Sequence, residues 1–216
     1  MTTINLKIKS DFITFKNKKN IFLKIIKREI PIGSDCFFRK ISKILGTTHE
    51  YVSYSNARKD IEKLLITKLS HSVTSDPFFP IWINDMSEIC KIFCEFLDEE
   101  KISFWIGSKR GCKRYHVDMV PFRVLVTYSG KGTELLPNNG ANRDAFLNGR
   151  TNKEIIKDIS LIRHIDKWNI AIFRGGKEGI LHRTPNSALK NNCSSVLMRL
   201  DNYSFLKKLK TINKVA

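Results

Sequence analysis

The sequence predicts an α+β fold in which helices lie to one side of a sheet or rolled barrel. Three observations lead to this prediction. Apolar residues recur at helical spacing through much of the first half of the chain. From Lys101 the period changes to the alternation typical of strands. Turns rich in Gly, Pro and Asn then separate the extended segments.

The first half opens with a segment of strand character. Met1–Ser10 alternates isoleucine and leucine with lysine, which indicates a β-strand. Apolar stripes at helical spacing follow it, and favourable cap residues or turn residues bound them. The expected helices are Cys36–Leu45, a segment that begins near Ser55 or Asn56, and one that follows Asn84 and closes at Asp98–Glu100.

The second half is expected to be mostly strands. Tyr115–Tyr128 is extended, and Pro121 within it indicates an edge position or a bulge. Thr151–Glu154 resembles a capping box and opens a short helix. The remaining expected strands are Lys101–Gly107, Trp168–Arg174, Ile180–His182 and Val196–Leu200.

The length of 216 residues fits one domain with a decoration, or one modest domain and a small second one. We expect residues 1–78 to form a basic, mostly helical N-terminal decoration and residues 79–216 to form the domain that carries the chemistry. No internal repeat or low-complexity linker interrupts the chain.

The apolar segments are too short and too charged for a membrane span, because no run of about 18 uncharged apolar residues occurs. The N-terminus also lacks the continuous apolar segment of a signal peptide. These features predict a cytoplasmic protein without a membrane partner. The five cysteines have no regular spacing, so neither a disulfide framework nor a zinc ribbon is indicated.

The net charge of +17 permits an acidic partner such as nucleic acid. A second explanation competes with it, because the lysines are spread along the whole chain among Asn and Ile residues. No stacking or groove-reading motif accompanies them. A nucleic-acid partner is therefore possible but not favoured, and the substrate, whether a small molecule or a protein side chain, stays unknown.

The residues that point to chemistry are His116, Asp118 and His182. His116 and Asp118 fall inside a strand pattern, so their side chains point to the same face, about 7 Å apart along the backbone. A third ligand from a neighbouring strand would complete a two-histidine, one-carboxylate metal site with open positions. His182 is the natural third ligand, since it follows a glycine turn and opens a strand.

Two further features near this motif have competing readings. A second His-x-Asp stands at His164 and Asp166, but only one strand and one turn separate it from His182, so His164 is read as a surface or loop residue. Cys112 lies four residues before His116. It is either an inert buried thiol or an oxidisable thiol or soft ligand beside the metal.

The order of these blocks resembles the double-stranded β-helix of Fe(II)/2-oxoglutarate dioxygenases. His-Val-Asp precedes a strand, the turn Gly130-Lys131-Gly132-Thr133 follows, and a strand ending in Arg-Gly-Gly leads to His182. The resemblance covers about ninety residues of the chain. It implies a jelly-roll or cupin-like core with N-terminal helices packed on one side, and Fe(II) held by His116, Asp118 and His182.

A closer resemblance is to an uncharacterised bacterial family, the domain of unknown function numbered 1826. The strings CKRYHVD, VLVTYSGKGTELLP, IAIFRGG, LHRTP and SSVLMRLD look like its signature blocks, from about Phe79 onward. The name of that family implies no activity, so the reaction must be inferred from the residues of the site.

The dioxygenase resemblance also implies a basic side chain that pairs with the far carboxylate of 2-oxoglutarate. Arg199 is the first candidate, and Arg123 could enter the pocket if Pro121 introduces a bulge. Tyr128 and Thr133 could add hydrogen bonds, although core packing and a turn role explain them as well. The family often has a basic residue at the start of the last strand, where Ser194 and Ser195 stand here.

Three functions follow from these readings. The first is an Fe(II)/2-oxoglutarate-dependent oxygenase that hydroxylates or demethylates an unknown substrate, with Asn138–Ile159 as a candidate lid. The alternative is a non-catalytic protein that binds Zn(II) through the same ligands for metal homeostasis. The third is a basic nucleic-acid-binding or base-modifying protein.

Overall fold

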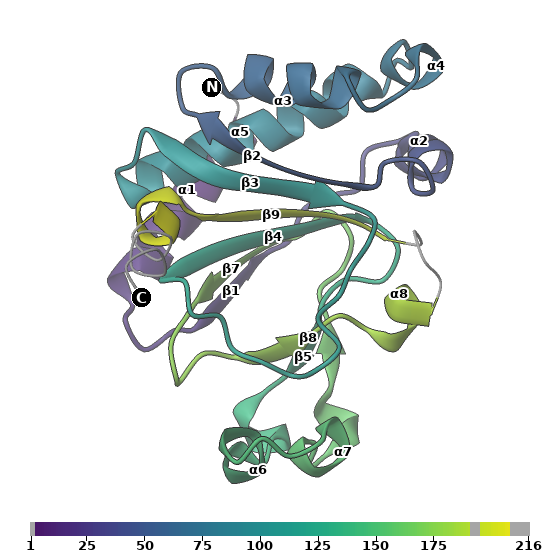
Figure 1. Cartoon of the computed structure of the whole chain (residues 1–216). Coiled ribbons are helices and arrows are strands. Elements are labelled where there is room, and N and C mark those ends of the chain that lie inside the picture. Colours follow the sequence, from purple (N-terminus) through teal and green to yellow (C-terminus); the bar gives the residue numbers. More distant parts are fainter. Residues whose placement is uncertain (1–2, 191–194, 208–216) are drawn as a thin grey trace.

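Two antiparallel β-sheets face each other in the computed structural model, which describes residues 3–190 and 195–207 (Figure 1). The larger sheet has the strand order β1-β7-β4-β9-β3-β2, and the smaller sheet has the order β6-β5-β8. The strands are β1 (Leu23–Ile26), β2 (Thr47–Ser53), β3 (Lys101–Gly107), β4 (Phe122–Ser129), β5 (Glu134–Leu136), β6 (Arg163–His164), β7 (Ile170–Arg174), β8 (Leu181–Arg183) and β9 (Val196–Asn202).

From β3 onward the chain alternates between the sheets in the manner of a double-stranded β-helix. An isolated bridge between His116 and His182 adds the segment before β4 to the edge of β8. The larger sheet thus receives β3, β4, β7 and β9, and the smaller sheet receives the His116 segment, β5, β6 and β8. The predicted α+β double-stranded β-helix is confirmed, although the two sheets do not close into a barrel.

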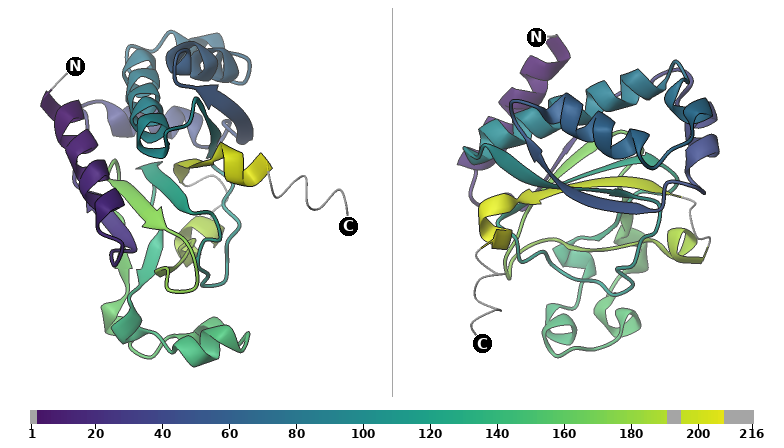
Figure 2. Two further views of the ribbon diagram at one scale, coloured as in Figure 1. Left: turned by 90° about the vertical axis from the view of Figure 1, so that its left-hand side faces the viewer. Right: turned by 45° about the horizontal axis from the view of Figure 1, so that its top comes forward.

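Helices cover the outer face of the larger sheet and also border the smaller one (Figures 1 and 2). Strand residues of even number in β3, β4, β7 and β9 pack against the covering helices in one extended core. The helices are α1 (Thr3–Asn17), α2 (Ser34–Ile41), α3 (Ala57–Ile66), α4 (His71–Thr74), α5 (Phe79–Leu97), α6 (Arg143–Leu147), α7 (Asn152–Ile155) and α8 (Asn186–Lys190), with 3-10 turns at Asn138–Gly140 and Ile159–Leu161.

The expected N-terminal strand is wrong, because residues 3–17 form helix α1. Ile8, Phe12 and Phe15 are buried, and their spacing of four and three residues places them on one helical face. The ring of Phe12 lies 5.5 Å from that of Phe96 in α5. The helix expected after Asn84 also begins earlier, at Phe79, since proline is well tolerated in a first helical turn.

The first 78 residues do more than decorate the second half. They supply β1 and β2, which form both edges of the larger sheet. Their buried side chains belong to the same hydrophobic core as those of β4 and β9. The boundary expected at residue 78 therefore falls within one continuous core.

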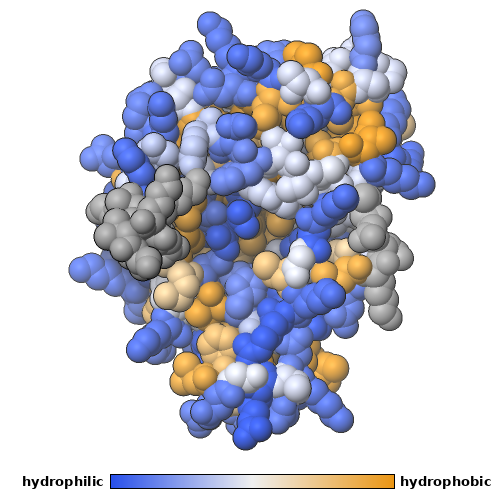
Figure 3. Space-filling model, viewed as in Figure 1, coloured by the Kyte–Doolittle hydropathy of each residue, from blue (hydrophilic) through white to orange (hydrophobic). Residues whose placement is uncertain are grey.

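Hydrophilic side chains cover helices and strands alike on the face drawn in Figure 3, with apolar side chains scattered between them. No helix among the described residues is long and apolar enough to cross a membrane.

Candidate metal centre

His116, Asp118 and His182 converge at the edge of the smaller sheet, on its inner side. The backbone N–H of His116 donates to the carbonyl of His182 at 3.1 Å, and the N–H of His182 donates back at 3.0 Å. This pairing places the two imidazoles side by side, with ring centroids 4.4 Å apart. Segments 66 residues apart are thereby brought to one point.

The glycine turn after β7 holds the third residue in place. The N–H of Gly176 donates to the carbonyl of Asp118 at 2.8 Å. A Cβ on Gly175 would lie only 2.6 Å from that same carbonyl, so the close approach requires glycine. The Arg-Gly-Gly turn seen in the sequence therefore fixes the backbone that carries the carboxylate.

One possible ligand atom from each of the three residues lies within 4.8 Å of the others. Nε2 of His182 is 3.4 Å from Oδ2 of Asp118. Asp118 and His182 are 5% and 4% exposed, whereas His116 is half-buried. The set is thus reachable from one side, as a site that accepts ligands must be.

The hydrogen bonds of the two imidazoles set their tautomers. Nδ1 of His116 lies 3.0 Å from the carbonyl of Arg114, and Nδ1 of His182 lies 3.0 Å from the carbonyl of Ile180. Because a carbonyl only accepts, each Nδ1 carries a proton, and in the neutral imidazole the lone pair is then on Nε2. That tautomer is the form in which Nε2 binds a metal.

Protonation of the two histidines is controlled differently. Burial lowers the pKa of His182 to about 4, although the Asp118 charge opposes the shift, so the imidazole is neutral near pH 7. Burial also opposes a proton on His116, but hydrogen bonds to the Cys112 thiol and the Arg114 carbonyl outweigh it and raise the His116 pKa. The bond to His116 in turn lowers the pKa of Cys112.

A cation fits these donors. Oδ2 of Asp118 is buried without a hydrogen-bond partner among the described residues. It faces the lone pair of a neutral His182, so two acceptors meet with no proton between them. An unsatisfied buried carboxylate oxygen is costly, and a divalent ion would satisfy it. Two imidazoles and one carboxylate suit both Fe(II) and Zn(II).

A chain of alternating charges leads from this carboxylate along the larger sheet. Arg123 donates to Oδ1 of Asp118, and its Nε donates to Asp201 at 2.6 Å. Asp201 also lies 3.1 Å from Nε of Arg199. Arg123 reaches the site directly from β4, and the register shift of that strand lies further on, between Thr127 and Ser129.

The comparisons with known proteins identify the family of this chain. A family model described as "Protein of unknown function (DUF1826)" matches residues 13–201. The chain belongs to this family. The search of curated proteins found no match.

Two solved structures resemble this DUF1826 member at low similarity. One is the selenomethionine-labelled Fe(II)/(alpha)ketoglutarate-dependent dioxygenase TqaL, with a TM-score of 0.43 and 6% identity over 93% of this chain and 89% of that chain. The other is a Caulobacter crescentus protein assigned to the 2OG-Fe(II) oxygenase family, with a TM-score of 0.30 and 10% identity over 93% of this chain and 74% of that chain.

The residues predicted to bind the co-substrate in this DUF1826 member differ in their contacts. Arg199 lies on the inner face of β9 above the ring of Trp105, and its buried Nε forms an ion pair with Asp201 at 3.1 Å. Arg123 forms ion pairs with Asp118 and Asp201. Thr133 is buried but contacts Arg110, with Nη2 of the arginine 2.8 Å from its hydroxyl.

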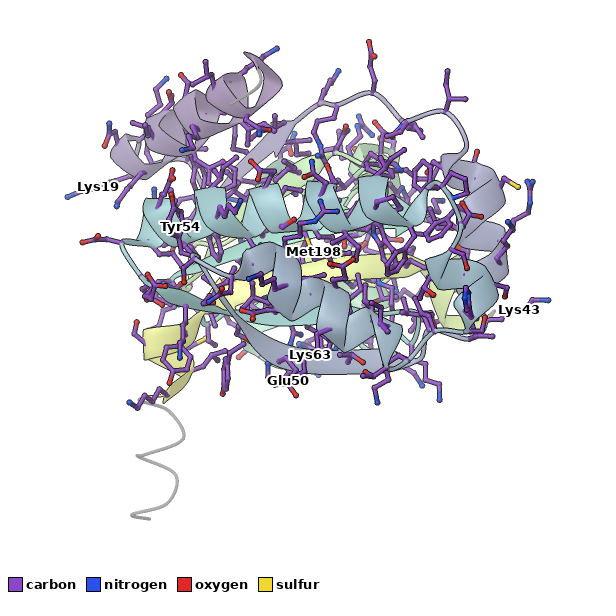
Figure 4. The ribbon with its side chains drawn as sticks, turned by 90° about the horizontal axis from the view of Figure 1, so that it is seen from above. Lys19, Lys43, Glu50, Tyr54, Lys63 and Met198 are labelled. Carbon is purple, nitrogen blue, oxygen red and sulfur yellow. The ribbon has the colours of Figure 1, made fainter. Side chains whose placement is uncertain are left out.

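Tyr128 is not brought to the site. Its side chain belongs to the core under the helices, on the opposite face of the larger sheet. Its hydroxyl donates to Asp85 of α5 at 2.8 Å, and lies 3.9 Å from the sulfur of Met198. Figure 4 shows Met198 among the helices that cover this face. Even-numbered residues of β4 point toward the helices, so Tyr128 faces away from the metal ligands.

Glu134 is a further buried charge whose burial no sequence pattern reveals, because it stands directly after a glycine turn. Glu134 is 6% exposed, on the outer face of the smaller sheet. Nε of Arg183 donates to it at 2.6 Å, the Tyr115 hydroxyl donates to the same oxygen, and Nε2 of His164 lies 3.4 Å away. Tyr115 and Arg183 flank His116 and His182, so one carboxylate anchors the neighbours of both histidines.

His164 is therefore half-buried beside Glu134 and outside the group formed by His116, Asp118 and His182. Cys112 is exposed and forms no disulfide, and its thiol bonds to His116 without being a member of that group. Of the two serines at the start of the last strand, Ser194 lies outside the described residues, and Ser195 is buried.

Proposed function

We propose that this DUF1826 member is a non-haem Fe(II)- and 2-oxoglutarate-dependent oxygenase that hydroxylates or demethylates a small molecule or a protein side chain. The observation that supports it is the meeting of two imidazoles, each with Nδ1 held by a backbone carbonyl, with an unsatisfied carboxylate oxygen on a double-stranded β-helix. Iron, when bound, would supply the redox chemistry with dioxygen and 2-oxoglutarate.

His116, Asp118 and His182 would hold the metal. The carbonyls of Arg114 and Ile180 keep both imidazoles in the ligating tautomer. Arg123 neutralises part of the charge of Asp118 and fixes the direction of its free oxygen. These contacts orient the ligands before a metal arrives, which lowers the cost of binding.

Arg199 would pair with a carboxylate of 2-oxoglutarate. Its guanidinium lies on the inner face of β9, one inward-facing position before Asp201. Burial lowers the Arg199 pKa, and the Asp201 charge only partly opposes this shift. A carboxylate ligand would therefore stabilise the charged guanidinium.

The same three ligands would hold Zn(II) in a protein without oxygenase activity, and metal analysis separates this second candidate from the first. Purified wild type is compared with His116→Ala, His182→Ala and the matched control His164→Ala. We expect the control to keep its metal and the other two variants to lose it. Equal metal content in all four proteins would overturn the assignment of the site.

The oxygenase proposal has its own test. Addition of 2-oxoglutarate to the anaerobic Fe(II) protein should produce the weak visible charge-transfer band of chelation, and Arg199→Met should require a higher concentration to produce it. Metal binding without this band would favour the zinc protein. The net charge of +17 is the one observation that favours a nucleic-acid partner, and salt-dependent binding to unrelated duplexes would reveal it.

A further inference from the structure

Arg110 lies in the loop that follows β3, beside the turn before β5 and the start of β9. Arg110 is half-buried with its Nε fully buried, and burial lowers the Arg110 pKa to about 10. In Figure 1, β3 ends and β9 begins on the same right-hand side of the larger sheet. Arg110 therefore lies at the end of β9 opposite to Asp201, which pairs with Arg123.

The partners of this guanidinium are all uncharged. Its Nη2 donates to the hydroxyl of Thr133 at 2.8 Å. Its Nη1 donates to the carbonyl of Lys131 at 3.2 Å and to the hydroxyl of Ser195 at 3.4 Å. Its Nε is buried with no hydrogen-bond partner among the described residues. The charged guanidinium of Arg110 is thus bonded only to neutral hydroxyl and carbonyl oxygens.

No carboxylate side chain forms an ion pair with Arg110 in the described part of the chain. Residues 1–2, 191–194 and 208–216 contain no Asp or Glu, so every acidic side chain is among those described. Arg123, Arg183 and Arg199, by contrast, each contact a buried carboxylate. A buried charge without a counter-charge is costly, which leaves Arg110 in need of an anion.

We propose that Arg110, Thr133 and Ser195 form a binding site for the carboxylate group of a small organic acid. Nε and Nη2 share one edge of the guanidinium, the edge that pairs with a carboxylate at two points, and Nη2 also donates to Thr133. Each hydroxyl accepts from Arg110 and keeps its own proton to donate. The site therefore offers donors on several sides and suits an oxyanion.

The turn before β5 holds Thr133 in position. A Cβ on Gly132 would lie 1.8 Å from the carbonyl of Ile165, so the chain can pass there only as glycine. The N–H of Ile165 donates to the carbonyl of Thr133 at 3.0 Å. The hydroxyl that faces Arg110 is thus set by a rigid turn, as expected of a preformed site.

The proposal does not rest on the oxygenase function, because it needs no metal. Full-length protein in the presence of a chelator is titrated with succinate by isothermal calorimetry. We expect one saturable site per chain and binding at least about tenfold weaker in Arg110→Met, since a lost charge-assisted pair has that effect. Thr133→Val should weaken binding by a smaller factor. The exposed arginine variant Arg163→Met should bind as wild type does.

Folding of the Arg110 variant is checked separately. Arg110→Met should melt at a higher temperature than wild type without succinate, since it removes an unpaired buried charge, and succinate should no longer raise that temperature. No saturable succinate binding by wild type would overturn the proposal. So would undiminished binding by both Arg110→Met and Thr133→Val, or saturable binding of inorganic phosphate alone.

Two further binding measurements identify which molecule supplies the carboxylate. His116→Ala should bind succinate as wild type does, which keeps this result apart from any failure of the metal site. Arg110→Met is then tested for 2-oxoglutarate binding with Fe(II). A loss there would assign the site to the far carboxylate of the co-substrate, and unchanged binding would assign it to a separate acid.

Discussion

Glu134→Gln tests whether one buried carboxylate anchors the segments that carry both histidines. Glutamine keeps the size of the side chain and removes its charge. In the wild type, Arg183 donates to Glu134 at 2.6 Å, and the two side chains are 11% and 8% exposed. The Tyr115 hydroxyl donates to the same oxygen.

The magnitude follows from these contacts. Each hydrogen bond to a charged group contributes about 1.5–3 kcal/mol, and glutamine retains part of each. We expect the free energy of unfolding to fall by about 2–4 kcal/mol. In a chain of 216 residues that loss lowers the melting temperature by about 10 °C.

The pH dependence has a defined sign. Burial raises the Glu134 pKa, but the hydrogen bonds from Arg183 and Tyr115 outweigh it and leave the pKa below its ordinary value of 4.5. A lowered carboxyl pKa stabilises the fold above the unfolded value, and that stabilisation is lost as the pH falls through the folded pKa. The difference between wild type and Glu134→Gln should therefore be full at pH 7 and shrink below about pH 4.5.

Urea denaturation followed by circular dichroism measures both effects. Glu154→Gln is the matched control, because Glu154 is an exposed capping-box residue bonded to Thr151, and its loss should cost about 1 kcal/mol. A Glu134→Gln loss no larger than that of the control, or one that grows toward acid pH, would refute the reasoning.

Three other substitutions probe the rest of the structure. Gly132→Ala should destabilise the protein by more than about 3 kcal/mol, since its Cβ would overlap a backbone carbonyl, whereas Gly111→Ala meets nothing within 4 Å and should melt as wild type does. Asp201→Asn should cost about 3 kcal/mol in urea denaturation, because it strips a buried partner from Arg123; a loss below about 1 kcal/mol would contradict the charge chain. Tyr128→Phe should lose about 1 kcal/mol of stability with unchanged metal content, and lost metal would place that side chain at the site after all.

Strand periodicity carried most of the fold prediction. Lys101–Gly107 was predicted with its observed ends, and the capping box at Thr151 is present with both of its hydrogen bonds. The strand prediction for the N-terminus is wrong because Ile4, Leu6 and Ile8 happen to alternate, whereas the buried helical set of Ile8, Phe12 and Phe15 extends beyond Ser10. Burial of these three side chains against α5 stabilises the helical conformation of the segment.

The site was predictable where ligand chemistry imposes a pattern. His116, Asp118 and His182 could be picked from the sequence because metal ligands must converge on one point, although Asp118 lies just beyond the His116 bridge and not in a strand. The charges around them could not. Asp201 stands two residues after Arg199, so their shared face was readable, but the pairing with Arg123 needed the register of β4 and β9. Arg110 lies in an irregular loop, where no period reveals its burial.

The order of the larger sheet has a consequence for biosynthesis. β9, the last strand among the described residues, lies between β4 and β3. Until residue 202 leaves the ribosome, β3 and β4 each present a bare inner edge, and such edges invite association with other chains. At about 5–20 residues per second, roughly 5–20 s pass between the emergence of β3 and that of β9. Productive folding must therefore wait for β9 to emerge, and holdase chaperones that shield open strands should raise its yield.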